Sequence, residues 1–194
     1  KKYPILIDQE GGRVQRIREG ATRFPPLRWL GNTDSIELVQ AHAKAMAAEV
    51  RAMGFHLNWA PDSDVDSNPA NPIIGNRSFG RDPQKVARCV FEWIQSAQSA
   101  GMACSAKHFP GHGDTDLDSH LELPCVEKDL PDIHAIELAP FRAAVAANVA
   151  TIMTAHVLFP AFDEEWPATL SARILTKLLR QEMGYQGVLV TDDM

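Results

Sequence analysis

Residues 102–120 read M-A-C-S-A-K-H-F-P-G-H-G-D-T-D-L-D-S-H and set the expectation for the whole fold. The first five, Met102–Ala106, form a short apolar run of strand length. The next fourteen, Lys107–His120, contain three of the seven histidines, three aspartates and a lysine, so they are poorly suited to a core. A strand that ends abruptly in charged and imidazole groups is typical of an α/β protein that carries its functional side chains on loops.

Apolar runs of strand length alternate with helical patterns on both sides of this stretch. Strands are expected at residues 5–7, 55–60, 102–106, 151–155 and 187–191. Helices are expected near residues 35–53, 82–101, 129–148 and 171–183, and Pro140 predicts a kink or a division into two segments in the third of these. Each crossover is long enough for parallel pairing, so the sequence predicts an α/β protein with a parallel sheet.

Polar side chains follow each expected strand, which favours one type of parallel sheet over the other. They are Asp8, Asn58 with Asp62, Lys107 with His108, His156, and Asp192. Functional groups at the carboxyl ends of many strands are typical of a (β/α)8 TIM-type barrel, whereas a doubly wound sheet concentrates its site near one switch point. Because five strands cannot close such a barrel, we expect residues 1–194 to be an incomplete interior portion of a single barrel domain that lacks strands at both ends.

Composition excludes several classes of function. The chain has 194 residues, is 45% hydrophobic and 23% charged, and carries a formal net charge of -6, so no nucleic-acid partner is expected. No apolar stretch approaches the roughly 20 residues that span a bilayer, so no membrane partner is expected either. The three cysteines lack metal-knuckle spacing and are odd in number, which favours a reducing compartment and predicts a cytoplasmic location.

Asp118 and His120 form the first candidate catalytic pair. An aspartate that accepts a hydrogen bond from one imidazole nitrogen makes the other nitrogen a better proton donor and acceptor near neutral pH. The simpler alternative is a surface loop whose polar groups cap one another. A metal site is a third interpretation, with ligands drawn from His108, His112, Asp114, Asp118 and His120. That spacing matches no common ligand pattern and Lys107 would repel a cation, so no metal or cofactor is expected.

Asp192 and Asp193 form the second candidate. One carboxylate can project into the mouth of the barrel as a nucleophile, or the pair can simply cap the next helix. A further mixed set, Asp8, Arg16, Arg77 and Lys107, has the charges and donors to hold a neutral polyhydroxy ligand, although lone arginines more often serve as surface charge. His156 is expected to be a core histidine rather than part of the site wall.

Four stretches together resemble a known family. They are, along the chain, Asp8–Arg16, Arg77-Ser78-Phe79, Lys107–Thr115 with Asp118-Ser119-His120, and Thr191-Asp192-Asp193. In this order they are similar to family 3 glycoside hydrolases, and more narrowly to the NagZ-type β-N-acetylglucosaminidase (β-hexosaminidase) branch. The match runs over almost the whole chain, and the long loop is its most specific part.

The resemblance implies a (β/α)8 barrel and a retaining mechanism through a covalent glycosyl-enzyme intermediate. It implies that Asp192 is the nucleophile, that His120 is the general acid/base, and that Asp118 orients His120. It also implies sugar contacts from Asp8, Arg16, Arg77, Lys107 and His108. The implied substrate is terminal β-linked N-acetylglucosamine, as in muropeptides of cell-wall recycling, and the protein is expected to act as a monomer.

Other functions stay open at this point. One is a phosphorylase of the same fold. A histidine that acts as a base is uncharged, so it would tolerate an incoming phosphate anion better than a carboxylate would. The acetamido group of the substrate can serve as the nucleophile in place of Asp192, and Asp193 is the other candidate for the covalent attachment. A non-catalytic sugar-binding barrel and a metal-dependent hydrolase are the remaining alternatives.

Overall fold

The computed structural model describes residues 3–116 and 123–193. Its strands are β1 (Leu6–Ile7), β2 (Gln9–Gly11), β3 (Val14–Gln15), β4 (Leu57–Asn58), β5 (Ala103–Phe109), β6 (Thr151–Thr154) and β7 (Val188–Thr191). Its helices are α1 (Leu27–Thr33), α2 (Ile36–Ala52), η1 (Gly75–Arg77), α3 (Pro83–Ser99), α4 (Leu130–Ala135), α5 (Leu138–Ala146) and η2 (Arg173–Glu182).

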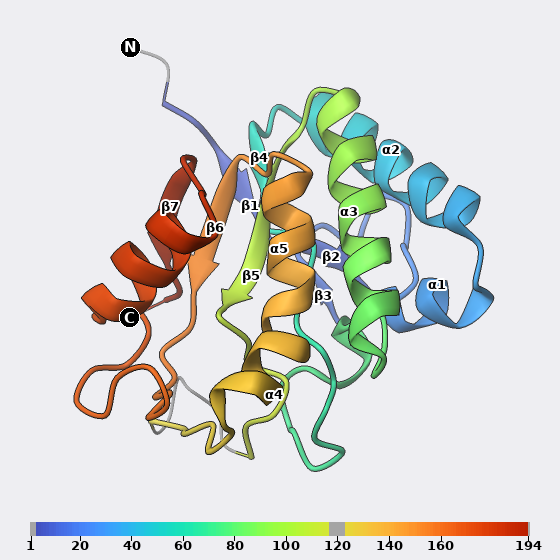
Figure 1. The fold of residues 1–194 in the computed structure, drawn as a ribbon. Coiled ribbons are helices and arrows are strands. Elements are labelled where there is room, and N and C mark those ends of the chain that lie inside the picture. The colour runs from blue at the N-terminus through green and yellow to red at the C-terminus, as the bar shows by residue number, and fades with distance from the viewer. Residues whose placement is uncertain (1–2, 117–122, 194) are drawn as a thin grey trace.

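Five strands form one parallel sheet in the order β1-β4-β5-β6-β7, which is also their order along the chain (Figure 1). A doubly wound sheet reverses its strand order at a switch point, and this sheet does not. Helices α2, α3 and α5 pack side by side against the sheet. The predicted α/β fold is confirmed as five consecutive strands of a (β/α)8-type barrel. The expectation that further strands precede and follow them stays a prediction.

The segment after β1 folds into a hairpin that the sequence did not predict. Strands β2 and β3 pair antiparallel in a separate two-stranded sheet. Gly11 and Gly12 make the turn with φ of 96° and 57°, and a Cβ on Gly11 would lie 2.5 Å from the carbonyl oxygen of Pro25. Asn58 binds the backbone N–H and C=O of Gln9 at 2.9 and 2.8 Å, so its role is to fix the hairpin against β4.

The two long helices begin where the sequence predicts. The side chain of Ser35 accepts a hydrogen bond from Leu38 N at the start of α2, and Asp82 accepts from Gln84 N and Lys85 N at the start of α3. Pro83 occupies the first position of α3, where its missing N–H costs nothing. These caps fix the ends of helices whose apolar faces are buried in the core.

Several elements differ from the predictions in extent or type. The strand expected at residues 55–60 forms only over Leu57–Asn58 as β4. The expected helix at residues 129–148 is divided into α4 and α5 between Ala135 and Leu138, and Pro140 then lies harmlessly in the first turn of α5. Helix η2 is a π-helix, in which Met183 N donates to Leu178 O five residues back. Strand β5 continues to Phe109, because parallel bridges to Asp62 and β6 extend the ladder past the expected end.

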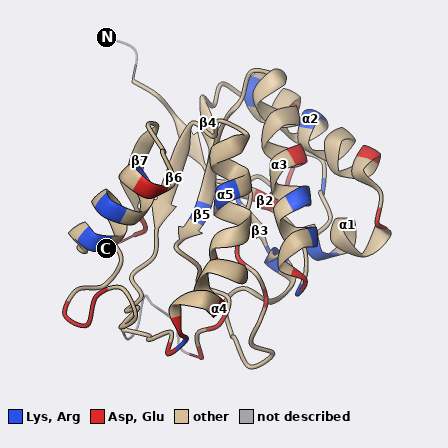
Figure 2. Cartoon of the chain, viewed as in Figure 1, with Lys and Arg blue, Asp and Glu red and all other residues tan. Residues whose placement is uncertain are grey.

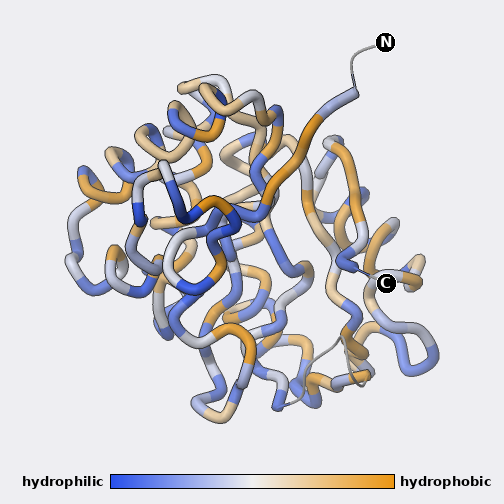
Figure 3. Tube along the Cα trace, turned by 180° about the vertical axis from the view of Figure 1, so that it is seen from behind, coloured by the Kyte–Doolittle hydropathy of each residue, from blue (hydrophilic) through white to orange (hydrophobic). Residues whose placement is uncertain are grey.

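Charged residues lie mainly on the helices and loops, and apolar residues are also exposed near the N-terminus. Lysine, arginine, aspartate and glutamate are distributed over the helices and the loops that connect them (Figure 2). The apolar run that enters β1 is visible from behind, and its Ile5 and Leu6 are 54% and 39% exposed (Figure 3). No helix among the described residues is both long and apolar enough to cross a membrane.

His42 in α2 predicts a loss of stability in mild acid. Its side chain is buried, its Nδ1 accepts a hydrogen bond from Trp93 Nε1 at 3.2 Å, and burial lowers its pKa to about 4. The unfolded chain therefore takes up this proton first as the pH falls from about 6.5 towards 4. We expect this histidine alone to cost about 2 kcal/mol of unfolding free energy between pH 8 and pH 5.

Urea unfolding of His42→Gln at both pH values checks this prediction. Glutamine keeps a hydrogen-bond acceptor for Trp93 but has no group that takes up a proton in this pH range. Between pH 8 and pH 5, the unfolding free energy of the variant should fall by about 2 kcal/mol less than that of the wild type. His56→Gln, at an exposed histidine, is the matched control for the loss of an imidazole as such. Equal slopes for His42→Gln and the wild type would contradict the assignment.

Candidate active site

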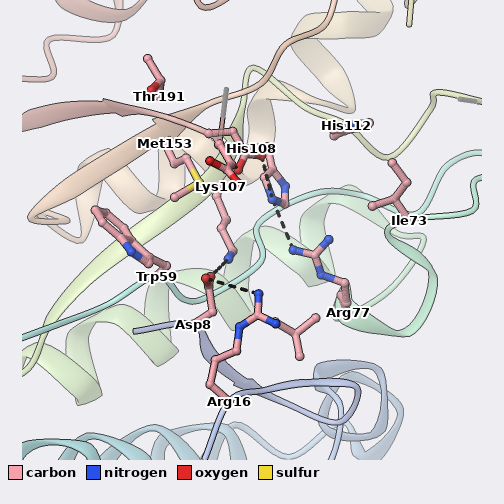
Figure 4. Close-up of a pocket in the computed structure, with 13 residues that line it drawn as sticks. Asp8, Arg16, Trp59, Ile73, Arg77, Lys107, His108, His112, Met153 and Thr191 are labelled. Atoms are coloured by element: carbon pink, nitrogen blue, oxygen red, sulfur yellow. Dashed lines mark hydrogen bonds and ion pairs between the residues drawn. The ribbon is translucent and has the colours of Figure 1, made fainter. Parts of the chain in front are cut away.

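The carboxyl ends of β1, β4, β5 and β7 meet at one edge of the sheet and surround a pocket of about 700 Å³ (Figure 4). Parallel strands bring their ends together in this way, so residues far apart in the sequence become neighbours. The pocket is lined by Asp8, Val14, Arg16, Trp59, Ile73, Arg77, Lys107, His108, His112, Met153, Thr191, Asp192 and Asp193.

Glu10 lies beneath the pocket between two cations. Its carboxylate is 1% exposed, accepts from Arg77 at 2.9 Å through both Nε and Nη2, and lies 2.7 Å from the Lys107 ammonium. Burial alone would raise the pKa of Glu10, but Lys107 and Arg77 outweigh it and hold that pKa far below its ordinary value. Glu10 is therefore an anion that keeps both cations in place.

Asp8 connects this buried group to the open pocket. Lys107 Nζ donates to Asp8 Oδ1 at 2.7 Å, and Arg16 Nη2 lies 3.8 Å from Asp8 Oδ2. Burial would lower the pKa of Lys107, but Glu10 and Asp8 raise it, so the ammonium stays charged. The Arg16 side chain is 69% exposed, which makes its ion pair weak and leaves its guanidinium able to turn towards a ligand.

Two buried aspartates after β4 have opposite electrostatic environments. Asp64 lies 2.7 Å from His108 Nδ1. Burial raises the pKa of Asp64, but the opposing effect of His108 and then His112 is larger, so the pKa of Asp64 is lowered overall. The pKa of Asp62 is raised well above its ordinary value, by burial first and then by the Asp64 charge, with Arg77 Nε 3.5 Å away opposing both. One of the two neighbouring carboxylates is favoured as an anion and the other as a neutral acid.

Asp192 follows β7 and forms the opposite wall of the pocket. Its backbone N–H donates to Thr154 O at 3.2 Å, and its Oδ2 lies 3.8 Å from His108 Nε2. The Asp192 side chain is 14% exposed and half-buried beside this cluster, whereas Asp193 is exposed. A nucleophile needs a carboxylate on the wall of a pocket, and Asp192 lies on such a wall, although its role stays a prediction.

The other half of the predicted catalytic machinery lies outside the described residues. Asp118 and His120 fall within residues 117–122, so their roles stay predictions. Before this segment, Asn71 holds the backbone of His112 and Thr115, each at 2.8 Å. After it, Lys128 contacts Asp114 at 2.9 Å and Glu137 at 2.7 Å, which ties the two flanks of the segment together.

Asp62, Asp64 and His108 each have one potential metal-ligand atom, and these three atoms lie within 4.8 Å of one another, close enough to hold a metal ion. However, the Arg77 guanidinium already lies 3.5 Å from Asp62, and His108 Nδ1 already lies 2.7 Å from Asp64 Oδ2. A cation placed there would oppose that guanidinium at short range. The local charges thus favour an ion-paired network over a metal centre.

Comparison with known families agrees with this geometry. The glycosyl hydrolase family 3 N terminal domain matches residues 2–194. The chain belongs to this family. A beta-hexosaminidase from Stenotrophomonas maltophilia K279a is 43% identical over 196 residues, which cover 98% of this chain and 58% of that protein. The chain therefore spans little more than half the length of this relative.

Solved structures of family members superpose closely on the fold. A family 3 β-N-acetylglucosaminidase from Paenibacillus sp. FPU-7 is 48% identical with a TM-score of 0.95, over 97% of this chain and 36% of that one. NagZ from Neisseria gonorrhoeae is 38% identical with a TM-score of 0.91, over 98% of this chain and 57% of that one. These matches extend the family assignment from sequence to tertiary structure.

Six of the eight predicted site residues of this family 3 chain line the same pocket. They are Asp8, Arg16, Arg77, Lys107, His108 and Asp192. The sequence separated Lys107 from Asp8 by 99 residues and Arg77 from Glu10 by 67, and the parallel sheet brings both pairs within hydrogen-bond distance. The roles of these residues in substrate binding and catalysis stay predictions, although their assembly in one place is now observed.

Sequence reasoning missed Glu10, Asp62 and Asp64 as members of the site. In the sequence, Asp62 stands out only as a polar group after an expected strand, and Glu10 only as a member of the Asp8–Arg16 stretch. The available signal was position, since all three closely follow β1 or β4. What the sequence lacked was the partner of each carboxylate, because those partners come from the distant Arg77, Lys107 and His108.

The interpretation of His156 as a core residue is wrong. This histidine is only half-buried, with Nδ1 2.9 Å from Thr169 Oγ1 and Nε2 3.0 Å from the carbonyl oxygen of Asp193. Strand β6 ends before it, so the side chain lies next to the segment that follows β7. It steadies the Asp192-Asp193 backbone from the side.

Proposed function

We propose that the protein is a retaining exo-β-N-acetylglucosaminidase that removes terminal β-linked N-acetylglucosamine. The observation that carries the proposal is the pocket that joins Asp192 to Asp8, Arg77, Lys107 and His108 in a chain of this family. Charged donors and acceptors at fixed positions suit the hydroxyl groups of a sugar, and Trp59 and Met153 supply apolar surface for its ring.

The reaction would proceed in two steps at the wall formed by β7. An Asp192 carboxylate oxygen attacks the anomeric carbon while the leaving oxygen takes a proton from His120, and Asp118 orients that imidazole. Water then attacks the glycosyl-enzyme and His120, now neutral, accepts its proton. Retaining glycosidases normally use two carboxyl groups about 5–5.5 Å apart, so a histidine in one role removes the mutual repulsion of two anions.

Binding would rest on the buried ion network rather than on loose surface charge. Lys107 is 3% exposed and Arg77 is 10% exposed at the side chain, so both hold fixed positions before a sugar arrives. Fixed donors lose less entropy on binding than mobile ones. We extend the proposal to muropeptide substrates in cell-wall recycling, a cytoplasmic location and a monomeric protein that needs neither metal nor cofactor.

The test is an assay of the full-length protein that contains this chain, with an aryl β-N-acetylglucosaminide, in buffers with and without phosphate. We expect free N-acetylglucosamine as the product in both buffers and unchanged activity after chelation. Formation of the sugar 1-phosphate would replace the hydrolase by a phosphorylase of the same fold. Sugar binding without any turnover would indicate a non-catalytic barrel.

A further inference from the structure

Asp64 gathers three donors from the segment that follows β5. Its carboxylate accepts from the backbone N–H of His112 at 2.7 Å and of His108 at 3.3 Å, and it lies 2.7 Å from His108 Nδ1. The side chain is completely buried. A buried carboxylate surrounded by donors is ionised and can only accept hydrogen bonds, so the proton between Asp64 and His108 belongs to Nδ1.

The opposite nitrogen of the same ring meets a group that can only donate. Arg77 Nη2 lies 3.3 Å from His108 Nε2, and a guanidinium has no acceptor. Arg77 is itself fixed by Glu10, with which it forms two hydrogen bonds of 2.9 Å. A hydrogen bond between these two groups therefore requires that Nε2 presents its lone pair. A doubly protonated ring would place an N–H against this guanidinium, although it would also face Asp192 Oδ2 at 3.8 Å.

We propose that Asp64 is a positioning residue that holds His108 in the Nδ1–H tautomer, so that Nε2 is a hydrogen-bond acceptor on the pocket wall. An imidazole whose tautomer is set by a carboxylate behind it presents one defined chemical face to the front. The group of the ligand that meets His108 must then be a donor, such as a sugar hydroxyl. This last step rests on the proposed function, whereas the tautomer does not.

The tautomer is measured directly in the ligand-free, full-length protein by NMR of 15N-labelled histidine, with His108 assigned from the signals lost in His108→Gln. At neutral pH we expect Nδ1 in the range of a protonated ring nitrogen and Nε2 in the range of an unprotonated one. A protonated Nε2 would overturn the proposal whatever the variants do, because it describes either the other tautomer or the imidazolium.

Two aspartates two residues apart provide a matched pair of variants. Asp64→Asn removes the anion and adds a competing donor, so the His108 signals should move to a mixture of tautomers. Asp62→Asn replaces an equally buried carboxyl whose charged form is already disfavoured, and the His108 signals should stay in place. Asp64→Glu should restore the wild-type pattern. If Asp64→Asn fails to fold, the spectra of the wild type and of Asp64→Glu still test the tautomer. Unchanged His108 signals in a folded Asp64→Asn protein would contradict the positioning role of Asp64.

The consequence for the ligand is tested with substrates in which each sugar hydroxyl in turn is replaced by fluorine, which cannot donate. At one position the wild type should lose about 10- to 100-fold in kcat/KM, the size of a hydrogen bond to a well-placed acceptor, and folded Asp64→Asn should lose much less. Equal losses in both proteins at every position would refute the specificity role. If no substrate is turned over at all, the proposed function fails, while the tautomer stands or falls on the spectra.

Discussion

Replacing Asp192 with alanine is expected to lower kcat on N-acetylglucosaminides by roughly 10⁴-fold or more, the scale seen when a nucleophile is removed from an enzyme. The reason is that no other described carboxylate lies half-buried on that wall of the pocket, 3.8 Å from His108. Binding of N-acetylglucosamine should change little, because Asp8, Arg77 and Lys107 remain. Steady-state kinetics with an aryl substrate and calorimetry with the free sugar measure the two effects separately.

Asp193→Ala is the matched comparison, since this neighbour is exposed and contacts His156 through its backbone rather than its carboxylate. We expect kcat to fall by at most about 10-fold in that variant. Trapping of a labelled sugar on the protein, followed by mass spectrometry, should locate it on Asp192. A larger loss from Asp193→Ala, or a label on Asp193, would reverse the assignment, and turnover without any label would favour attack by the substrate's own acetamido group.

Glu10→Gln should destabilise the protein by about 3–5 kcal/mol, because it leaves the buried cations Arg77 and Lys107 facing each other without their shared anion. The pKa of Glu10 is lowered in the folded protein, so its contribution is present above the ordinary value of 4.5 and is lost as the pH falls below it. The difference in unfolding free energy between Glu10→Gln and the wild type should therefore become smaller in acid. Urea unfolding at pH 7 and below pH 4.5 measures both values.

The control for this experiment is Glu19→Gln, at an exposed glutamate, which should leave stability nearly unchanged. The double variant Glu10→Gln with Lys107→Met should lose less than the sum of the two single changes, because it removes the cation that the first change left unpaired. Additive losses would show that Glu10 and Lys107 do not act as a pair. A loss from Glu10→Gln below about 1 kcal/mol would contradict the buried network itself.

Local pattern was sufficient for most of the elements. Ser35 and Asp82 cap the helices at the predicted positions, and Pro83 fits the first turn of α3, because capping depends on neighbours in sequence. The hairpin of β2 and β3 escaped prediction, since its short strands have no clear alternation of apolar and polar residues. The division of the helix after Asp129 was anticipated from Pro140, but the break falls four residues earlier, between Ala135 and Leu138.

The sequence by itself determined which chemical groups lie near the carboxyl ends of the strands: Asp8 at β1, Lys107 and His108 at β5, and Asp192 at β7. It also determined the parallel class of the sheet, because the alternation of short apolar runs and helices depends only on local composition. The protonation states of Glu10, Asp62 and Asp64 and the tautomer of His108 were decided by tertiary structure alone. Burial and distant partners set these properties, and residues 44 to 99 positions apart in the sequence become charged neighbours only when the strand ends converge.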